Sequence, residues 1–257
     1  MNPYLFALLV SLGINTLFFI FAYAFKTDKF TDFTYGMTFI LLTIYFLIST
    51  GTYHSFQNLL SLMVIVWGVR LIAYLLIRIL KIKKDKRFDQ MRENALSFYK
   101  FWFFQGVAVW AIMLPTIYVL LEKKDIGIVP WMVVGMLIWA LGLIIETVSD
   151  WQKFVFKNNK KNKGLWIDSG LWKYSRHPNY FGEILLWWGL FAYASPLLSG
   201  LGWFTIVGPM FITFILMFVS GIPLLEKKYD ERHKSNKKYQ EYKKSTSLLV
   251  IFPKKKI

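Results

Sequence analysis

Polar and ionisable side chains are concentrated in residues 164–183 (GLWIDSGLWKYSRHPNYFGE), which lead directly into an apolar segment. The side chains there that could bind a ligand or take part in a reaction are Arg176, His177, Asn179 and Glu183. Pro178 fits the first turn of a helix, where a missing N–H costs nothing, and on that helix Asn179 and Glu183 share one face. Arg176 and His177 lie at the helix N-terminus, which favours anions. The pattern predicts a polar pocket at a membrane interface that binds an anionic ligand.

Composition places the chain among polytopic membrane proteins. Of its 257 residues, 56% are hydrophobic and 19% are aromatic, which is far from the composition of a soluble domain. The net charge of +16 lies in a few loops and the tail, which is typical of membrane orientation signals and contact with anionic lipid. No nucleic-acid-binding motif accompanies this charge, so we expect no nucleic-acid partner. The chain has no cysteine and only three scattered histidines, which indicates no metal site.

Seven apolar segments are long enough to approach the roughly 20 residues that a spanning helix needs. They are Pro3–Phe25, Tyr35–Gly51, Leu59–Leu80, Phe101–Leu121, Ile128–Val148, Asn179–Leu198 and Trp203–Leu225. Basic loops alternate with loops that are neutral or balanced, which predicts an N-terminus outside and a C-terminus in the cytoplasm. We therefore expect an all-α polytopic protein with one transmembrane domain over residues 1–257. It would lie in the cell membrane of a bacterium or the endoplasmic reticulum of a eukaryote.

Ionisable side chains also occur within or beside the predicted spans, where a charge is costly unless it is paired or functional. Arg70 lies mid-span, too deep to reach the headgroups, and we expect it to be paired or bound to a ligand. Glu146 and Asp150 are one helical turn apart, and a cation or a hydrogen-bonding ligand would relieve their repulsion. Asp32 and Tyr35 open the second span, where a helix cap and an interfacial tyrosine are the simpler interpretation.

The run from Gly170 to Glu183 (GLWKYSRHPNYFGE) resembles the signature of the steroid 5-alpha-reductase-like membrane family. It is especially similar to a bacterial branch of that family whose substrate is unassigned. The resemblance continues along most of the chain. The other matching segments are Trp67-Gly-Val-Arg70-Leu, Lys84–Phe88, Gln105 with Leu114-Pro115, Asp150-Trp-Gln152, Ser220-Gly-Ile-Pro223-Leu-Leu-Glu226-Lys and Tyr239-Gln-Glu-Tyr242.

The resemblance implies an enzyme that binds NADPH from the cytosol, with residues 146–250 carrying the cofactor site. It implies hydride transfer to a carbon–carbon double bond conjugated to a carbonyl in a hydrophobic, lipid-like substrate. The resemblance places Asn179 and Glu183 at the nicotinamide amide of the cofactor, and Glu146 and Asp150 at its adenine-side ribose and backbone. It places Arg70, Arg176, Tyr174 and Tyr242 near the phosphates. His177 and Tyr180 belong to the same motif. Guanidinium groups suit phosphates, and an Asn–Glu pair can satisfy a carboxamide.

The proton donor of the implied reaction is harder to place. Steroid-acting members of the family polarise the substrate ketone with a Glu of the second span and a Tyr of the third. The predicted second span of this chain, Tyr35–Gly51, contains no acidic residue, and Asp32 stands at its edge. Tyr74 is a loose match for the tyrosine. Asp32, Tyr35 and Tyr74 are therefore the candidates for proton delivery.

Two other classes of function fit parts of the sequence. Isoprenylcysteine carboxyl methyltransferases carry a similar Arg-His-Pro-x-Tyr-x-Gly motif, a later Glu and a Tyr-x-x-Tyr tail, and they bind S-adenosylmethionine. Asn179 and Glu183 belong to the reductase version of the motif, which favours NADPH over that alternative. The third class is a non-enzymatic lipid-binding or assembly protein. The concentration of polar groups on one side of the predicted membrane segments disfavours it.

Overall fold

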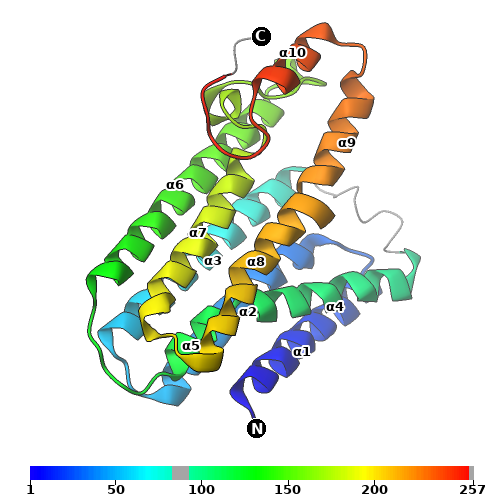
Figure 1. Cartoon of the computed structure of the whole chain (residues 1–257). Coiled ribbons are helices and arrows are strands. Elements are labelled where there is room, and N and C mark those ends of the chain that lie inside the picture. Colours follow the sequence, from blue (N-terminus) through cyan, green and yellow to red (C-terminus); the bar gives the residue numbers. More distant parts are fainter. Residues whose placement is uncertain (83–92, 255–257) are drawn as a thin grey trace. The chain divides into compact units, whose positions relative to one another are not determined.

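The computed structural model describes residues 1–82 and 93–254, and the regular structure in these residues is helical (Figure 1). The α-helices are α1 (Pro3–Ala24), α2 (Lys29–Thr50), α3 (Ser55–Ile82), α4 (Ala95–Ile112), α5 (Leu114–Leu121), α6 (Pro130–Asn158), α7 (Pro178–Ala194), α8 (Val207–Phe214), α9 (Ile222–His233) and α10 (Lys237–Ser245). Short 3-10 and π turns connect several of them. The all-α prediction is confirmed for the described residues, and the Lys84–Phe88 segment lies outside them.

Within residues 1–82 and 93–254, six helical segments are long and apolar enough to cross a membrane, which makes the chain an integral membrane protein. They are Pro3–Ala24, Lys29–Thr50, Ser55–Lys81, Ala95–Ile112, Pro130–Asn158 and Gly200–His233. The helix within the sixth predicted span, α7, has 17 residues and is not among these six. Seven spans and the orientation of the termini stay predictions.

Two of the predicted spans differ from the observed helices. The predicted span Phe101–Leu121 is divided at Met113 into α4 and α5, because Pro115 has no N–H to continue the helical hydrogen bonds. The second predicted span begins earlier, at Lys29, so Asp32 lies in the first turn of α2 instead of capping it. The charged tail continues beyond α9 in a separate helix, α10, which Asn236 caps by accepting from Tyr239 N–H.

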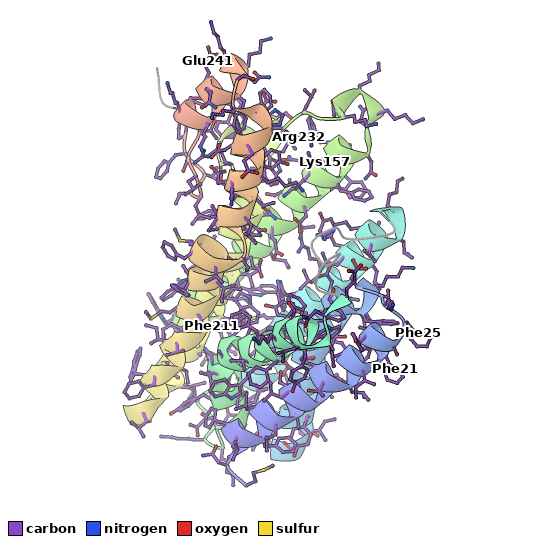
Figure 2. The ribbon with its side chains drawn as sticks, turned by 90° about the vertical axis from the view of Figure 1, so that its right-hand side faces the viewer. Phe21, Phe25, Lys157, Phe211, Arg232 and Glu241 are labelled. Carbon is purple, nitrogen blue, oxygen red and sulfur yellow. The ribbon has the colours of Figure 1, made fainter. Side chains whose placement is uncertain are left out.

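The chain divides into two compact units. The first unit comprises residues 1–133 and 191–208, and the second comprises residues 134–190 and 209–257. Phe21 and Phe25 of the first unit are exposed and project from the end of α1 (Figure 2), as expected for side chains that meet lipid. The single transmembrane domain expected over residues 1–257 stays a prediction.

Polar side chains join helices inside the first unit. Ser11 Oγ donates to the Gly106 carbonyl at 2.8 Å, which ties α1 to α4. Gln105 Nε2 donates to Asn15 Oδ1 at 3.0 Å and to the Thr31 carbonyl at 3.1 Å, which links α4 to α1 and α2. Such bonds satisfy buried polar groups in a region without water, so they specify which helices pair.

Glycines set the spacing of α6 and α7 in the second unit. A Cβ at Gly182 would lie 2.5 Å from Glu146 N, and a Cβ at Gly142 would lie 2.6 Å from Leu186 N. A Cβ at Gly189 would likewise lie 2.5 Å from Trp139 N. Small residues at these positions let the two backbones approach closely. The polar ends of α6 and α7 are thereby held side by side.

Candidate functional site

The close approach of α6 and α7 unites the two acidic residues of α6 with the polar turn of α7. Glu146 and Asp150 are 3% and 6% exposed, and Asn179 Nδ2 donates to Asp150 Oδ1 at 3.2 Å. Asn179 Oδ1 is buried and has no hydrogen-bond partner among the described residues. Glu183 follows one turn later on α7. The predicted Pro178 start of this helix is confirmed, and its polar turn retains a buried acceptor for a ligand.

The segment before α7, residues 164–177, is anchored to the end of α6, and we call it the signature loop. Gly170 has φ +59, and a Cβ there would lie 2.5 Å from the side chain of Gln152. Gln152 Oε1 accepts from Leu171 N–H at 3.0 Å, and the Trp172 indole donates to the Ser149 carbonyl at 3.0 Å. Glycine is favoured at position 170 by both the backbone conformation and the close contact.

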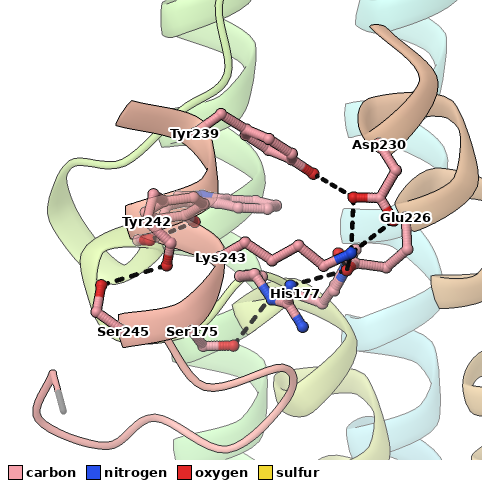
Figure 3. Close-up of polar contacts among 10 residues, drawn as sticks. Ser175, His177, Glu226, Asp230, Tyr239, Tyr242, Lys243 and Ser245 are labelled. Carbon is pink, nitrogen blue, oxygen red and sulfur yellow. Dashed lines mark hydrogen bonds and ion pairs between the residues drawn. The ribbon is translucent and has the colours of Figure 1, made fainter. Parts of the chain in front are cut away.

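The C-terminal segment completes the signature loop. Tyr242 on α10 donates its hydroxyl to the Trp172 carbonyl at 2.8 Å. Arg176 N–H donates to the Ser247 carbonyl at 2.9 Å, and Ser175 Oγ donates to the Leu249 carbonyl at 2.6 Å. The tail therefore satisfies main-chain groups of the loop just before α7. Figure 3 shows Ser175 beside His177, and Tyr242 with Ser245 on α10.

Glu226 on α9 joins the two basic residues at the end of the signature loop. Its Oε2 lies 2.9 Å from Arg176 Nη1, and its Oε1 lies 2.9 Å from His177 Nε2. Lys243 Nζ approaches the same carboxylate at 3.7 Å and hydrogen-bonds Asp230 Oδ1 at 2.6 Å (Figure 3). Sequence reasoning assigned Glu226 no site role, because its partners lie about fifty positions earlier in the chain. An acidic residue at the start of a strongly basic tail was the available signal.

Burial controls the protonation of His177 and the tyrosines of the tail. His177 is 3% exposed, and burial lowers its pKa below 6.5, an effect that the Glu226 carboxylate opposes but does not overcome. Burial raises the pKa of Tyr239 and of Tyr242 above the ordinary value of 10. All three side chains are therefore neutral at pH 7, since removing a group from water disfavours its charged form.

A small cavity of about 30 Å³ lies between the signature loop, α6, α9 and α10. Its lining combines basic groups, a carboxylate and aromatic rings: Lys153, Trp166, Ile167, Trp172, Arg176, His177, Leu225, Glu226, Tyr229, Tyr239 and Tyr242. The cavity has room for about one water-sized group. Arg176 Nε and His177 Nδ1 are buried and have no hydrogen-bond partner among the described residues, so both can still bind a ligand or a water.

Two further predicted residues, Tyr180 and Tyr174, lie near Arg176 and His177 in the chain. The Tyr180 ring stacks on the His177 ring, with centroids 5.8 Å apart and planes 8° apart. Tyr174 is 38% exposed, and its ring accepts a cation–π contact from Lys173 at 5.7 Å. Tyr180 therefore helps to orient the imidazole, whereas Tyr174 lies at the edge, accessible to solvent or a ligand.

The remaining predicted residues belong to the first unit, on α2 and α3. Asp32 Oδ2 lies 3.9 Å from Arg78 Nη2, in a half-exposed ion pair. The Arg70 guanidinium lies 5.6 Å from the centre of the Tyr74 ring, and Tyr35 contacts the buried Trp67 edge-on, with centroids 6.5 Å apart. The structure thus groups Asp32, Tyr35, Arg70 and Tyr74 on two adjacent helices. The roles expected for these four residues stay predictions.

Comparison with known proteins adds relatives of named activity. The chain is 29% identical to the 3-oxo-5-alpha-steroid 4-dehydrogenase 1 of Rattus norvegicus over 126 residues, 48% of this chain and 42% of that protein. It is 31% identical to the protein of the same name from Macaca fascicularis over 127 residues, 48% of this chain and 41% of that protein. A shorter match, 43% identity over 51 residues, joins it to the probable O-methyltransferase ustE of Ustilaginoidea virens, over 20% of this chain and 18% of that protein.

These alignments span less than half of the length of each curated relative. No solved structure matches the chain. The profile of the family described as "Protein of unknown function (DUF1295)" matches residues 18–246, which include the signature loop, α6, α7 and Glu226 with its basic partners. The chain is therefore a member of the DUF1295 family, a steroid 5-alpha-reductase-like family of integral membrane proteins.

Proposed function

We propose that the protein is an NADPH-dependent reductase of the membrane, acting on a carbon–carbon double bond conjugated to a carbonyl in a lipid-like substrate. A steroid, an isoprenoid or a fatty enone belongs to this substrate class. Support comes from the family and from two relatives named as 3-oxo-5-alpha-steroid 4-dehydrogenases. Apolar helices give such a substrate access from the bilayer.

The observation that carries the proposal is the set of buried, unsatisfied polar atoms in the second unit. Asn179 Oδ1 is an acceptor for the N–H of a carboxamide, and Arg176 Nε is a donor for a phosphate oxygen. Native proteins rarely leave such atoms buried without partners. A ligand with both an amide group and phosphates, as NADPH has, matches these two atoms, so the residues present fit the cofactor.

Each predicted residue has a distinct task in this proposal. Asn179 and Glu183 hold the carboxamide, and Glu146 and Asp150 hold the adenine-side ribose and backbone. Arg176, Tyr174, Arg70 and Tyr242 contribute to the phosphate region. The Tyr242 hydroxyl also donates to the Trp172 carbonyl in the loop that carries Arg176. When bound, NADPH supplies the hydride, while the protein supplies position and electrostatics.

Proton delivery is assigned to the first unit. Asp32, Tyr35 and Tyr74 are the candidates, and the structure groups their helices, α2 and α3, through close glycine contacts at Gly36 and Gly68. Tyr74, whose ring centre lies 5.6 Å from the Arg70 guanidinium, is the candidate that we test first. Tyr74→Phe, which removes only the hydroxyl, tests this assignment through turnover at unchanged cofactor affinity.

A membrane methyltransferase that binds S-adenosylmethionine is the alternative. One relative carries the name of a probable O-methyltransferase, but its match covers 20% of the chain, against 48% for the steroid dehydrogenases. The paired Asn179 and Asp150 side chains and the neighbouring Glu183 favour an amide-bearing dinucleotide. The reductase is therefore the preferred function.

Thermal unfolding of the detergent-solubilised protein tests the choice of cofactor. NADPH at a hundredfold its dissociation constant should stabilise the fold by about 2.7 kcal/mol, whereas S-adenosylmethionine should leave the unfolding temperature unchanged. NADH, which lacks the 2′-phosphate of NADPH, serves as the matched control for recognition of that group. Stabilisation by the sulfonium compound alone would falsify the reductase proposal.

A further inference from the structure

His177 follows Arg176 in the chain and, from its position alone, would serve as a second cation for an anionic ligand. The structure gives it a different partner. Its Nε2 lies 2.9 Å from Glu226 Oε1, and an ionised carboxylate can only accept a hydrogen bond. Nε2 therefore carries the proton of the ring, and in the neutral imidazole Nδ1 is left as an acceptor.

The imidazole is fixed on several sides. Glu226 holds Nε2, the Tyr180 ring stacks parallel to it at 8°, and Ser175 Oγ accepts the His177 main-chain N–H at 3.1 Å. Nδ1 is buried and has no hydrogen-bond partner among the described residues, and the side chain lines the cavity of about 30 Å³. An oriented acceptor beside a cavity is suited to a donor group that enters the cavity.

Charged groups from each neighbouring element act on the protonation of this ring. Arg176 of the signature loop and Lys153 of α6 disfavour a further positive charge, and Glu226 of α9 favours it. Lys243 of α10 lies against the same Glu226 carboxylate, and Asp230 of α9 lies against Lys243. Burial is the largest influence and lowers the pKa of His177, so the neutral ring is the form present at pH 7.

We propose that His177 binds the ligand as a neutral acceptor, with Nδ1 accepting from a hydroxyl or amide N–H of the dinucleotide, and that Glu226 fixes the ring in this form. The inference rests on the proposed function. Phosphate oxygens accept but do not donate when ionised, so they cannot satisfy Nδ1. The ribose hydroxyls and the carboxamide are the donors that a dinucleotide offers. Arg176 then contacts the anionic part of the ligand, and His177 contacts a neutral part.

Nitrogen NMR of histidine-labelled protein tests the state of the ring without any cofactor. The chain has three histidines, and loss of one signal set in His177→Asn assigns the resonances. We expect the Nε2–H tautomer at pH 7 in the wild type and a mixture of tautomers in Glu226→Gln, whose amide can donate as well as accept. A doubly protonated His177, or an Nδ1–H tautomer, at pH 7 overturns the proposal.

Binding of NADP⁺ across pH 5.5 to 8 tests the role of the ring, because the two possible roles have opposite signs. An acceptor is lost on protonation, so affinity should fall as the pH falls, approaching about tenfold for each pH unit below the point where His177 protonates. His177→Asn, which keeps a non-titrating amide near the imidazole position, should lose this part of the dependence. His54→Asn, in the other unit, is the matched control and should keep it. Any titration of the NADP⁺ phosphates contributes equally to the pH dependence of the wild type, His177→Asn and His54→Asn.

The outcomes separate this inference from the proposed function. Affinity that rises on acidification in the wild type but not in His177→Asn would make His177 a phosphate-binding cation and overturn the inference alone. Failure of NADP⁺ and NADPH to bind at any pH, with the Nε2–H tautomer intact, overturns the proposed function and with it the dinucleotide as donor.

Discussion

Asn179 on α7 donates a hydrogen bond to Asp150 on α6, at 3.2 Å, beside the glycine contact that lets the two helices meet. Gly182, on the same helical segment as Asn179, lies so close to α6 that an added Cβ would fall 2.5 Å from Glu146 N. The contact between backbones thus determines the contact between side chains. Asn179 can reach Asp150 because Gly182 has no side chain to hold the two helices apart.

Gly182→Ala should therefore disturb both stability and binding. Its methyl group would meet main-chain atoms of Glu146 and Gly142, and overpacking of this kind costs about 1–3 kcal/mol. Gly13→Ala on α1, whose Cβ would have no atom within 4 Å, is the control and should not destabilise the protein, because alanine is favoured over glycine inside a helix by about 0.5–1 kcal/mol. Thermal unfolding in detergent and NADPH titration measure the two effects. Equal unfolding temperatures for both variants would contradict the close contact.

Asn179→Ala and Glu183→Gln should weaken NADPH binding while the protein stays folded. Asn179→Ala removes the amide, and Glu183→Gln exchanges a carboxylate acceptor for a neutral amide of the same shape. An unpaired buried partner costs about 1–3 kcal/mol, a loss of roughly 5- to 150-fold in affinity. Lys173→Ala, in the exposed part of the signature loop, is the control. Titration calorimetry measures the dissociation constants. Wild-type affinity in Glu183→Gln together with lost binding in Lys173→Ala would mean that the site is misplaced.

Glu226→Ala should destabilise the second unit strongly. The Arg176 and Glu226 side chains are 12% and 17% exposed, and removal of one partner leaves a buried charge uncompensated, at about 3–5 kcal/mol for a fully buried pair and less here. Lys243→Ala breaks a more exposed contact with the same carboxylate and should cost under about 1 kcal/mol. Chemical unfolding of the two variants compares these effects. A larger loss in Lys243→Ala would contradict the assignment of Glu226 as the central partner.

His177 gives stability a defined dependence on pH. Its pKa in the folded protein is below the value of 6.5 expected when it is unfolded, so between these values the unfolded chain binds more protons. The stability that His177 contributes is complete above pH 6.5 and is lost as the pH falls toward the folded-state pKa. His177→Asn should flatten this part of the profile of unfolding temperature against pH. A wild-type profile that rises on acidification through this range would contradict the neutral, buried ring.

Reporter fusions test the orientation. A reporter on the C-terminus and one within the Lys157–Lys163 loop should report the cytoplasmic side, and one on the N-terminus should report the other side, because basic loops remain in the cytoplasm. Figure 2 shows Lys157 and Arg232 at the same end of the second unit. An external report from the loop would exclude a pocket that faces the cytosol.

The sequence by itself determined the features that depend on local spacing. Apolar length and composition predicted membrane helices, Pro178 marked the start of α7, and the four-residue interval placed Asn179 and Glu183 on one face of it. These inferences hold because helix geometry relates neighbours three or four positions apart whatever the rest of the chain does. The division at Pro115 was missed, because Phe101–Leu121 was predicted as one span, although the local signal was present in a proline that lacks the N–H a continuous helix needs.

Only the tertiary structure decided which polar groups meet. Glu226 joins Arg176 and His177 from a distant helix, and Ser247 and Leu249 of the tail bond to the signature loop. A periodic pattern assigns a residue to a face but leaves its partner across the interface open. The protonation of His177 follows the same rule, because burial and a distant carboxylate set the state of the imidazole, and its neighbour Arg176 alone would indicate the opposite role.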